Sequence, residues 1–264
     1  MPLGANSTIT IRRRENLSLP PRRQPGRRDR RRRPNRRYSG ADVLNLGTAT
    51  GDSVALADAA LLAPVSPSKI VAVGRNYAEH AKELGNEAPS EPIIFLKPPS
   101  AVLAPNGTIV RPPQSQRVDF EGELVIVIGR TARNIQRADW RSVVLGFTCA
   151  NDVTARDLQK KDVQFTRGKS FDTFCPLGPC IETELDPSAL SLRTRVNGET
   201  KQNGNTHDMV FDCSFIIEFI TSVMTLQPGD VILTGTPAGV GPLASGDRVE
   251  VEIEGIGSLK NVVA

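Results

Sequence analysis

The stretch FEGELVIVIG, residues 120–129, combines two patterns that guide the interpretation of the whole chain. Its second half is apolar throughout, which is typical of a strand buried on both faces. Its first half places Glu121 and Glu123 two positions apart, with only Gly122 between them. Side chains two apart on a strand point to the same face, so the two carboxylates converge on one spot. The stretch therefore predicts a buried strand that presents paired acidic groups.

On both sides of this stretch, short apolar runs alternate with turn residues. We expect further strands at residues 69–74, 92–97, 142–153, 230–235 and 248–259. Helical spacing is found at residues 76–85, where Asn76 is a candidate N-cap and Gly85 a stop signal. A longer amphipathic helix is expected at residues 211–226, ended by Pro228 and Gly229. Many strands, two or three helices and no regular alternation between them favour a β-rich α+β fold.

Charge divides the chain into two unlike parts. Residues 1–40 contain 13 Arg against Glu15 and Asp29, a balance of +11, whereas the remaining residues have a balance of −7. The segment RRQPGRRDRRRRPNRR has no apolar periodicity and repels itself, so we expect disorder. It could be an arm for nucleic acid or another anionic surface, or the product of a misplaced start site or reading frame. The acidic body and the lack of interleaved aromatic residues argue against a nucleic-acid partner.

Several classes of protein are excluded by the composition. Four cysteines form no C-x-x-C pair and no zinc spacing, which indicates reduced, buried thiols: Cys149, Cys175, Cys180 and Cys213. No apolar run approaches the roughly 20 residues of a membrane span, and the N-terminus lacks the core of a signal peptide. No phosphate-binding glycine loop stands between a strand and a helix. We therefore expect a cytoplasmic protein without a membrane partner or a nucleotide cofactor.

The paired carboxylates are a candidate metal site. Two carboxylates beside an apolar run repel each other and lose hydration, so they need a cation or a shared proton. Mg²⁺ or Mn²⁺ would satisfy both Glu121 and Glu123, since these ions prefer oxygen ligands. The pattern alone is ambiguous, because residues 182–184 and 250–254 alternate equally well and are expected to be solvated strand faces. Asp152, at the end of an apolar segment, is the candidate third ligand, or else a helix cap.

His80 and Glu83 are a candidate proton-transfer pair. They lie three apart on the helix expected at 76–85, so the carboxylate can orient the imidazole and raise its basicity. Such a pair can act as a general base or activate a water molecule. The alternative is a purely structural histidine. His207, in a polar loop, is expected to be a surface residue.

Further along the chain, several polar residues are candidates for contact with a substrate. If residues 154–162 turn helical, Asp152, Arg156 and Gln159 share one face. Lys169, expected in a loop rich in Gly, Ser and Pro, could neutralise a substrate carboxylate or stabilise an enolate, unless it is simply solvated. In LTGTPAGVG, residues 233–241, exposed backbone N–H groups and the Thr236 hydroxyl could form an anion nest.

Taken in order, these segments resemble the fumarylacetoacetate hydrolase family. The resemblance covers roughly residues 64–261 and is carried by VGRNYAEHAKELG, FLKPPSAV, VDFEGELVIVIG, GFTCANDVTARDLQ, FTRGKSFDTFCPLGP, VNGE, LQPGDVILTGTPAGVG and SGDRVEVEIEGIGSLKN. The nearest look-alikes are 2-hydroxyhepta-2,4-diene-1,7-dioate isomerases and acylpyruvases. By this resemblance, residues 68–264 form the catalytic domain, a mixed β-sandwich roll that dimerises. Residues 41–67 are then a remnant of a small N-terminal segment behind the tail at 1–40.

The resemblance also implies roles for individual residues. A divalent ion, Mg²⁺ or Mn²⁺ with Ca²⁺ as a further candidate, would be held by Glu121, Glu123 and Asp152. His80, Glu83 and Lys169 would be catalytic. Substrate-side positions would be Arg75, Tyr77, Arg156, Gln159, Lys169, Gly235 and Thr236.

The implied activity is metal-dependent chemistry on small 2-oxo or enol carboxylic acids, including dicarboxylates of aromatic catabolism. One enolate intermediate leads to three outcomes, namely isomerisation or tautomerisation, decarboxylation, and C–C hydrolysis of acylpyruvate or fumarylacetoacetate type. Oxaloacetate would be a substrate for the first two of these outcomes. The sequence leaves the three outcomes open. Two further alternatives are a nucleic-acid binder that uses the arginine-rich tail, and a metal-binding but inactive paralogue.

Overall fold

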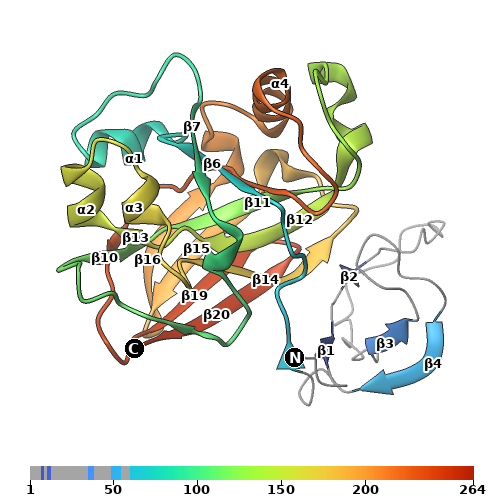
Figure 1. Cartoon of the computed structure of the whole chain (residues 1–264), viewed down its shortest axis with the longest axis horizontal. Helices are drawn as coiled ribbons and strands as arrows, with labels where there is room; N and C mark the ends of the chain where they lie inside the picture. Colours follow the sequence, from blue (N-terminus) through green and yellow to red (C-terminus); the bar gives the residue numbers. More distant parts are fainter. Residues whose placement is uncertain (1–6, 9–10, 13–34, 39–48, 55–59) are drawn as a thin grey trace, which may run out of the picture.

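The computed structural model describes residues 7–8, 11–12, 35–38, 49–54 and 60–264. Most of the arginine-rich segment and much of the predicted remnant at 41–67 lie outside these described residues. In the described part, strands dominate and four short α-helices lie around them (Figure 1). This is the β-rich α+β fold that the sequence predicted.

The largest sheet carries the acidic stretch at its centre. Its strands run in the order β2 (Ile11–Arg12), β14 (Cys175–Glu182), β12 (Val144–Asn151), β11 (Gly122–Ile128), β17 (Val231–Leu233), β6 (Ile70–Gly74) and β7 (Ile93–Lys97), with β8 (Val102–Leu103) beside β14. β11 pairs antiparallel with both β12 and β17. Leu124 and Ile126 enter one core cluster while Val125 and Val127 enter another, which confirms that both faces of this strand are buried.

A second sheet packs against the first. Its order is β16 (Glu199–Asn205), β15 (Ser191–Val196), β19 (Arg248–Ile253), β20 (Gly257–Val263) and β9 (Thr108–Ile109). Leu192 and Val251 of this sheet share a core with Leu124 and Ile126 of β11. The helix α4 (Cys213–Val223) buries its apolar face in the same cluster. The site-bearing end of β11 is therefore fixed from two sides.

The remaining elements frame one end of these sheets. A three-stranded sheet joins β13 (Thr154–Ala155), β10 (Val118–Phe120) and β18 (Gly241–Pro242). Near it lie α1 (Ala78–Glu83), α2 (Arg156–Lys161) and α3 (Thr166–Lys169) (Figure 1). Short 3₁₀ helices span Pro99–Ala101, Arg137–Val143, Pro187–Ala189 and Thr206–Asp208, and two small sheets pair β1 (Ser7–Thr8) with β5 (Ala60–Leu61) and β3 (Asn35–Tyr38) with β4 (Ala49–Val54).

The prediction of Asn76 as a helix cap was wrong. Tyr77 is the N-cap of α1 and makes no capping hydrogen bond through its side chain. The buried Asn76 amide instead donates to the carbonyls of Phe211 and Thr234, at 3.0 and 2.7 Å, and accepts from the Phe211 N–H. Asn76 therefore ties the end of β6 to two distant segments, a role that no local pattern signals.

Three element boundaries also differ from prediction. The strand expected at 120–129 is split at Glu121, whose N–H is taken by the Asn151 side chain at 2.9 Å. α4 ends at Val223, before Pro228, because the chain turns extended to let Leu226 bond with the backbone of Ala132. Lys169 was expected in a loop, but it closes the short helix α3 and is buried.

The expectation of solvated carboxylates at 182–184 was wrong for Glu182, which is 4% exposed. It closes β14, an interior strand of the large sheet, so its position is covered on both flanks. By contrast, Glu250 and Glu252 are only half-buried and pair with Lys260 and Arg195 on the sheet surface.

Candidate active site

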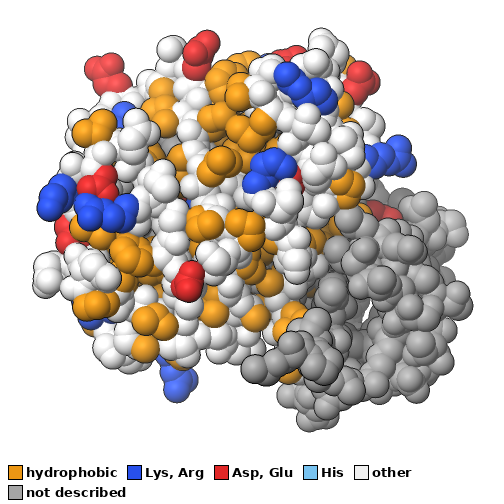
Figure 2. Space-filling model, in the orientation of Figure 1, with side chains coloured by type: hydrophobic (Ala, Val, Ile, Leu, Met, Phe, Trp, Pro, Cys, Tyr) orange, Lys and Arg blue, Asp and Glu red, His pale blue; other side chains and the backbone are white. Residues whose placement is uncertain are grey.

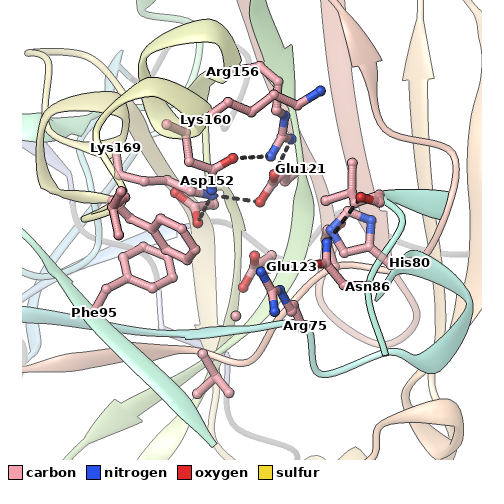
Figure 3. A pocket seen from close by; sticks show the side chains of 17 residues that line it. Arg75, His80, Asn86, Phe95, Glu121, Glu123, Asp152, Arg156, Lys160 and Lys169 are labelled. Carbon is pink, nitrogen blue, oxygen red and sulfur yellow. Dashed lines mark hydrogen bonds and ion pairs between the residues drawn. The ribbon is translucent and has the colours of Figure 1, made fainter. Parts of the chain in front are cut away.

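Three acidic side chains from β10, β11 and β12 meet at one point (Figure 3). Glu121 follows β10, Glu123 lies in β11 and Asp152 follows β12. Each is buried, and each offers a carboxylate oxygen within 4.8 Å of the other two. The Asp152 N–H donates to the Glu121 carbonyl at 2.8 Å, which locks the two strand ends together. The helix-cap alternative for Asp152 is excluded, since the N-cap of α2 is Ala155.

Gly122 lets the two glutamates approach the second sheet. A Cβ atom placed there would lie 2.1 Å from Thr194 Oγ1 and 3.2 Å from a methyl group of Val251. The Gly122 N–H donates to the Gln202 side chain at 3.0 Å. Any larger residue at this position would push the acidic pair away from its support.

Buried cations hold the carboxylates in place. Lys169 Nζ lies 2.7 Å from Glu121 Oε2 and 2.6 Å from Asp152 Oδ2. Lys97 Nζ lies 2.7 Å from the other Asp152 oxygen and also donates to the Lys169 carbonyl. Arg156 contacts Glu121 through Nη2 and Asp119 through Nε, the latter at 2.9 Å. These charge-assisted bonds fix the orientation of two members of the triad.

The two glutamates of the triad differ in acidity. Burial raises the pKa of Glu121, but the nearby charges of Lys169 and Arg156 outweigh it and bring the pKa below its usual value. Burial and the negative charges of Asp152 and Glu121 hold the pKa of Glu123 well above its usual value. For Lys169, the attraction of Asp152 and Glu121 overcomes the effect of burial, so the pKa is raised. The pKa values of Glu121 and Glu123 are therefore shifted in opposite directions by their surroundings.

The donor set suits a hard divalent cation. The Gly235 N–H donates to Glu123 Oε2 at 2.6 Å, while no described residue donates to Oε1 of the same carboxylate. A carboxylate oxygen that already accepts one hydrogen bond keeps a second lone pair. Three carboxylates and no nitrogen or sulfur donor match Mg²⁺ or Mn²⁺, which bind oxygen at about 2.1 Å. The residues present thus fit the predicted ion, although they do not distinguish one from the other.

His80 and Glu83 are in contact, as the helical spacing predicted. His80 Nδ1 lies 3.2 Å from Glu83 Oε2, so the other ring nitrogen is left for exchange with water or substrate. Glu83 Oε1 accepts from the Gly239 N–H at 3.1 Å and thereby joins α1 to the loop after β17. In the view of Figure 3, His80 lies on one side of the triad and Lys169 and Phe95 on the other.

Most of the predicted substrate-side residues surround the same cavity of about 340 Å³. The cavity is lined by Arg75, His80, Glu121, Glu123, Asp152, Arg156, Gln159, Lys169 and Thr236. Gln159 accepts from Arg156 Nη1 at 2.6 Å. The Thr236 hydroxyl donates to the Gly122 carbonyl at 2.8 Å and accepts from Gln202, so it supports the acidic strand.

Tyr77 and Gly235 do not line the cavity. Gly235 acts through its N–H, which holds Glu123, and its φ of +97° favours glycine. Tyr77 is 2% exposed and its hydroxyl finds no partner among the described residues. Burial raises the pKa of Tyr77 above its usual value, with Glu123 adding to the effect.

Lys97 and Asp119 were missed in the sequence. Lys97 ends an otherwise apolar run, IIFLK, and a lysine in such a run is a signal for a paired, buried charge. Asp119 precedes Glu121 by two residues and so continues the same alternation. Its function differs, since it accepts from Arg156 and from Arg117, at 2.9 and 2.8 Å, and holds Arg156 against the triad.

The comparison with protein families gives an unambiguous result. The family model described as "Fumarylacetoacetate (FAA) hydrolase C-terminal" matches residues 69–264. The chain belongs to the fumarylacetoacetate hydrolase family. The match spans every element that builds the cavity.

Relatives within this family carry names of isomerases and tautomerases. A solved structure of 2-hydroxyhepta-2,4-diene-1,7-dioate isomerase from Mycobacterium marinum is 51% identical, with a TM-score of 0.78 and 84% of each chain covered. A 5-carboxymethyl-2-hydroxymuconate delta-isomerase from Mycobacterium smegmatis is 52% identical, with a TM-score of 0.78, covering 82% of this chain and 86% of that one. The human protein named oxaloacetate tautomerase FAHD2A, mitochondrial, is 48% identical over 76% of this chain and 68% of its own length.

Two further expectations can be compared with the described residues. The four cysteines are buried and none of them forms a disulfide, as the sequence predicted. No helix in the described ranges is long and apolar enough to cross a bilayer.

Proposed function

We propose that this chain is a divalent-metal-dependent enzyme that interconverts keto and enol forms, or moves a double bond, in small 2-oxo dicarboxylic acids. The substrates would resemble 2-hydroxyhepta-2,4-diene-1,7-dioate or oxaloacetate, as in the catabolism of aromatic compounds. The observation that carries the proposal is the buried triad, whose Glu123 faces a cavity also lined by His80. Relatives named as isomerases and a tautomerase support the same reaction class.

Different residues of the cavity have different roles in the proposed reaction. A divalent ion, when bound, supplies a Lewis acid that polarises the 2-oxo group of the substrate. His80, oriented by Glu83, accepts or returns a proton at a carbon next to that group. Lys169 and Arg156 place positive charge where negative charge develops. Phe95 and Phe165 cover one wall of the cavity and restrict water there.

C–C hydrolysis is the second candidate, and the His80–Glu83 contact favours it. A paired histidine beside a cavity can activate water for attack on a second carbonyl group. Decarboxylation remains a third outcome of the same polarised carbonyl. Product analysis separates the three reactions. Isomerisation yields a tautomer or isomer, C–C hydrolysis yields two smaller acids, and decarboxylation releases CO₂.

Turnover assays with a matched variant pair test the proposal. Oxaloacetate, acetylpyruvate and a 2-hydroxymuconate-type diacid would be assayed with Mg²⁺, with EDTA, and in Glu123→Gln and Glu252→Gln variants. We expect metal-dependent turnover of at least one substrate, lost in Glu123→Gln and kept in Glu252→Gln, whose carboxylate lies on the sheet surface. A folded protein that binds Mg²⁺ but converts none of the three would instead indicate an inactive paralogue.

We also infer a cytoplasmic homodimer with no nucleic-acid or membrane partner. Figure 2 shows one face of the molecule, where hydrophobic side chains spread through the middle and most charged groups lie near the rim. Leu96, on the end strand β7 of the large sheet, is 48% exposed. Light scattering gives the mass in solution. Salt-sensitive binding of a DNA duplex that disappears on removal of residues 1–40 would support the nucleic-acid alternative.

A further inference from the structure

Val163, in the connection between α2 and α3, has a backbone conformation that is unfavourable for valine. Its φ is +61°, in the left-handed region that β-branched residues rarely enter. The Gln164 N–H donates to the Asp162 carbonyl at 2.5 Å, so Val163 stands at the centre of a three-residue turn. A turn of this kind with a positive φ at its centre is rare and strained. Such strain persists only where the surrounding structure imposes it.

Contacts on both sides of the turn impose this conformation. Before it, Asp162 is the C-cap of α2 and accepts from Arg167 Nε at 2.5 Å, while Arg167 Nη2 contacts its other carboxylate oxygen. After it, Phe165 is the N-cap of α3, and its ring meets the Phe95 ring edge-on with the centroids 5.5 Å apart. The turn is therefore fixed at both ends, and Val163 forms its tip.

The Val163 side chain is exposed and also lines the cavity. It is 83% exposed, the highest fraction among the large hydrophobic side chains of the described residues. Together with Leu84, Phe95 and Phe165 it forms the apolar part of the cavity lining, and Figure 3 shows Phe95 on the side of the triad away from His80. A single exposed apolar side chain is common on protein surfaces. One that is also held in a strained backbone conformation gains nothing for the fold, which points to a function at the cavity.

We infer that Val163 determines substrate specificity by contacting the apolar carbon chain of the substrate, at the end remote from the triad. The inference rests on the proposed function, in which the 2-oxo group and its carboxylate lie at the triad and the rest of the chain extends along the cavity. A cavity of about 340 Å³ lies within the range that holds drug-sized ligands, so it has room beyond a four-carbon acid. The substrates are therefore 2-oxo acids with several carbon atoms beyond the 2-oxo group.

Calorimetric titration of the Mg²⁺-loaded full chain with 2-oxobutanoate and 2-oxooctanoate tests the inference, because these acids share one head group and differ only in chain length. We expect the longer acid to bind more tightly. Val163→Asn should reduce the ratio of the two affinities by about fourfold or more, which corresponds to one buried CH₂ group. Val110→Asn, at a position that is 50% exposed and outside the cavity lining, is the matched control and should keep the parent ratio.

The two ways of failing are distinguishable. An unchanged ratio in Val163→Asn, or an equal loss of affinity for both acids, overturns the inference and leaves the proposed function standing. If the Mg²⁺-loaded parent chain binds neither acid, the proposed function and the inference both fail.

The melting temperature of the same variants gives a readout that does not depend on any ligand. Asparagine adopts a positive φ more readily than valine, so Val163→Asn should raise the melting temperature by about 2 °C or more. Val110→Asn should not raise it, since Val110 has no positive φ. A more stable variant that discriminates less between the two acids is the expected trade-off between stability and function. A melting temperature that stays the same or falls in Val163→Asn overturns the inference, because valine would then cost the fold nothing.

Discussion

At the scale of single residues, the site depends on two glycines as much as on its charged side chains. Gly122 separates the two glutamates, and the atoms that a side chain would meet there belong to the second sheet. Gly235 holds Glu123 through its N–H in a backbone conformation that favours glycine. The acidic side chains can therefore be placed accurately only because neighbouring positions carry no Cβ.

Gly122→Ala should destabilise the protein by about 2 kcal/mol or more, since overpacking a buried contact typically costs 1–3 kcal/mol. The added methyl group would overlap Thr194 Oγ1, a buried hydroxyl without a partner among the described residues. Urea denaturation measures the loss. Gly241→Ala, where a Cβ would meet only ordinary contacts at 3.4 Å, should be nearly neutral. Addition of Thr194→Ala to Gly122→Ala should restore part of the stability, and no recovery would contradict the steric explanation.

Glu83→Gln should lower kcat by about tenfold to a hundredfold, because His80 loses its ionic partner while the amide can still accept from Gly239. Mg²⁺ affinity should be unchanged, since neither residue belongs to the triad. Steady-state kinetics and calorimetry measure the two effects. Glu79→Gln, in the first turn of the same helix, is the control. If Glu79→Gln lost as much activity as Glu83→Gln, the cause would be a disturbed helix α1 and not the loss of the His80–Glu83 contact.

At the scale of elements, the strands that carry the site are joined by buried side chains outside the cavity. Asp230 stands just before β17 and accepts from the N–H groups of Ser68 and Lys69, both at 3.0 Å, and from that of Gln227 at 2.7 Å. Lys69 Nζ also contacts the second carboxylate oxygen of Asp230. One carboxylate therefore fixes the parallel pairing of β6 and β17, which carry Arg75 and Gly235 at their far ends.

The stability of this junction should depend on pH. Burial raises the pKa of Asp230, but the donors from Lys69, Gln227 and Ser68 outweigh it and lower the pKa below its usual value. Because the folded pKa lies below the unfolded value of about 3.9, the stabilisation is present above that value and is lost as pH falls through the folded pKa.

Asp230→Asn should therefore lower the free energy of unfolding at neutral pH by about 2 kcal/mol, as expected for lost bonds to a charged group. Its unfolding free energy should also fall less between about pH 5 and pH 2 than that of the parent chain. Urea titrations across this range test both expectations. Asp172→Asn, on the surface, should reproduce the parent curve. Identical slopes in all three proteins would show that Asp230 has no part in acid unfolding.

At the scale of the whole molecule, segments from residue 97 to residue 169 form one network of three acids and four bases. It joins Asp119, Glu121 and Asp152 to Lys97, Arg117, Arg156 and Lys169. These segments come from the large sheet, from the three-stranded sheet and from the short helices α2 and α3 at one end of the fold. Glu121 and Asp152 are therefore paired within the protein without help from a metal, whereas Glu123 accepts only from the Gly235 N–H.

EDTA should accordingly change the melting temperature by only a few degrees, whereas Mg²⁺ and oxalate together should raise it more than the sum of their separate effects. A ligand present at about 100 times its dissociation constant stabilises the native state by about 2.7 kcal/mol. Differential scanning calorimetry in EDTA, Mg²⁺, oxalate and both ligands measures these shifts. Collapse of the fold in EDTA would show that the ion is structural.

The sequence by itself determined the strands around residues 120–129, the double burial of β11, the pairing of Glu121 with Glu123 and the contact of His80 with Glu83. These features depend on residues two to four apart, whose relative directions the backbone of a strand or helix dictates. The family resemblance and the third carboxylate, Asp152, followed from the order of such segments.

Only the tertiary structure decided which alternating glutamates are buried together and which lie on the surface. It also revealed that Lys97 and Asp119 belong to the site, that Asn76 joins distant segments, and that Lys169 is buried between two carboxylates. These side chains are brought into contact by strands far apart in the chain. The physical reason is that a buried charge takes its partner from whatever the packing places beside it, and local periodicity carries no information about that neighbour.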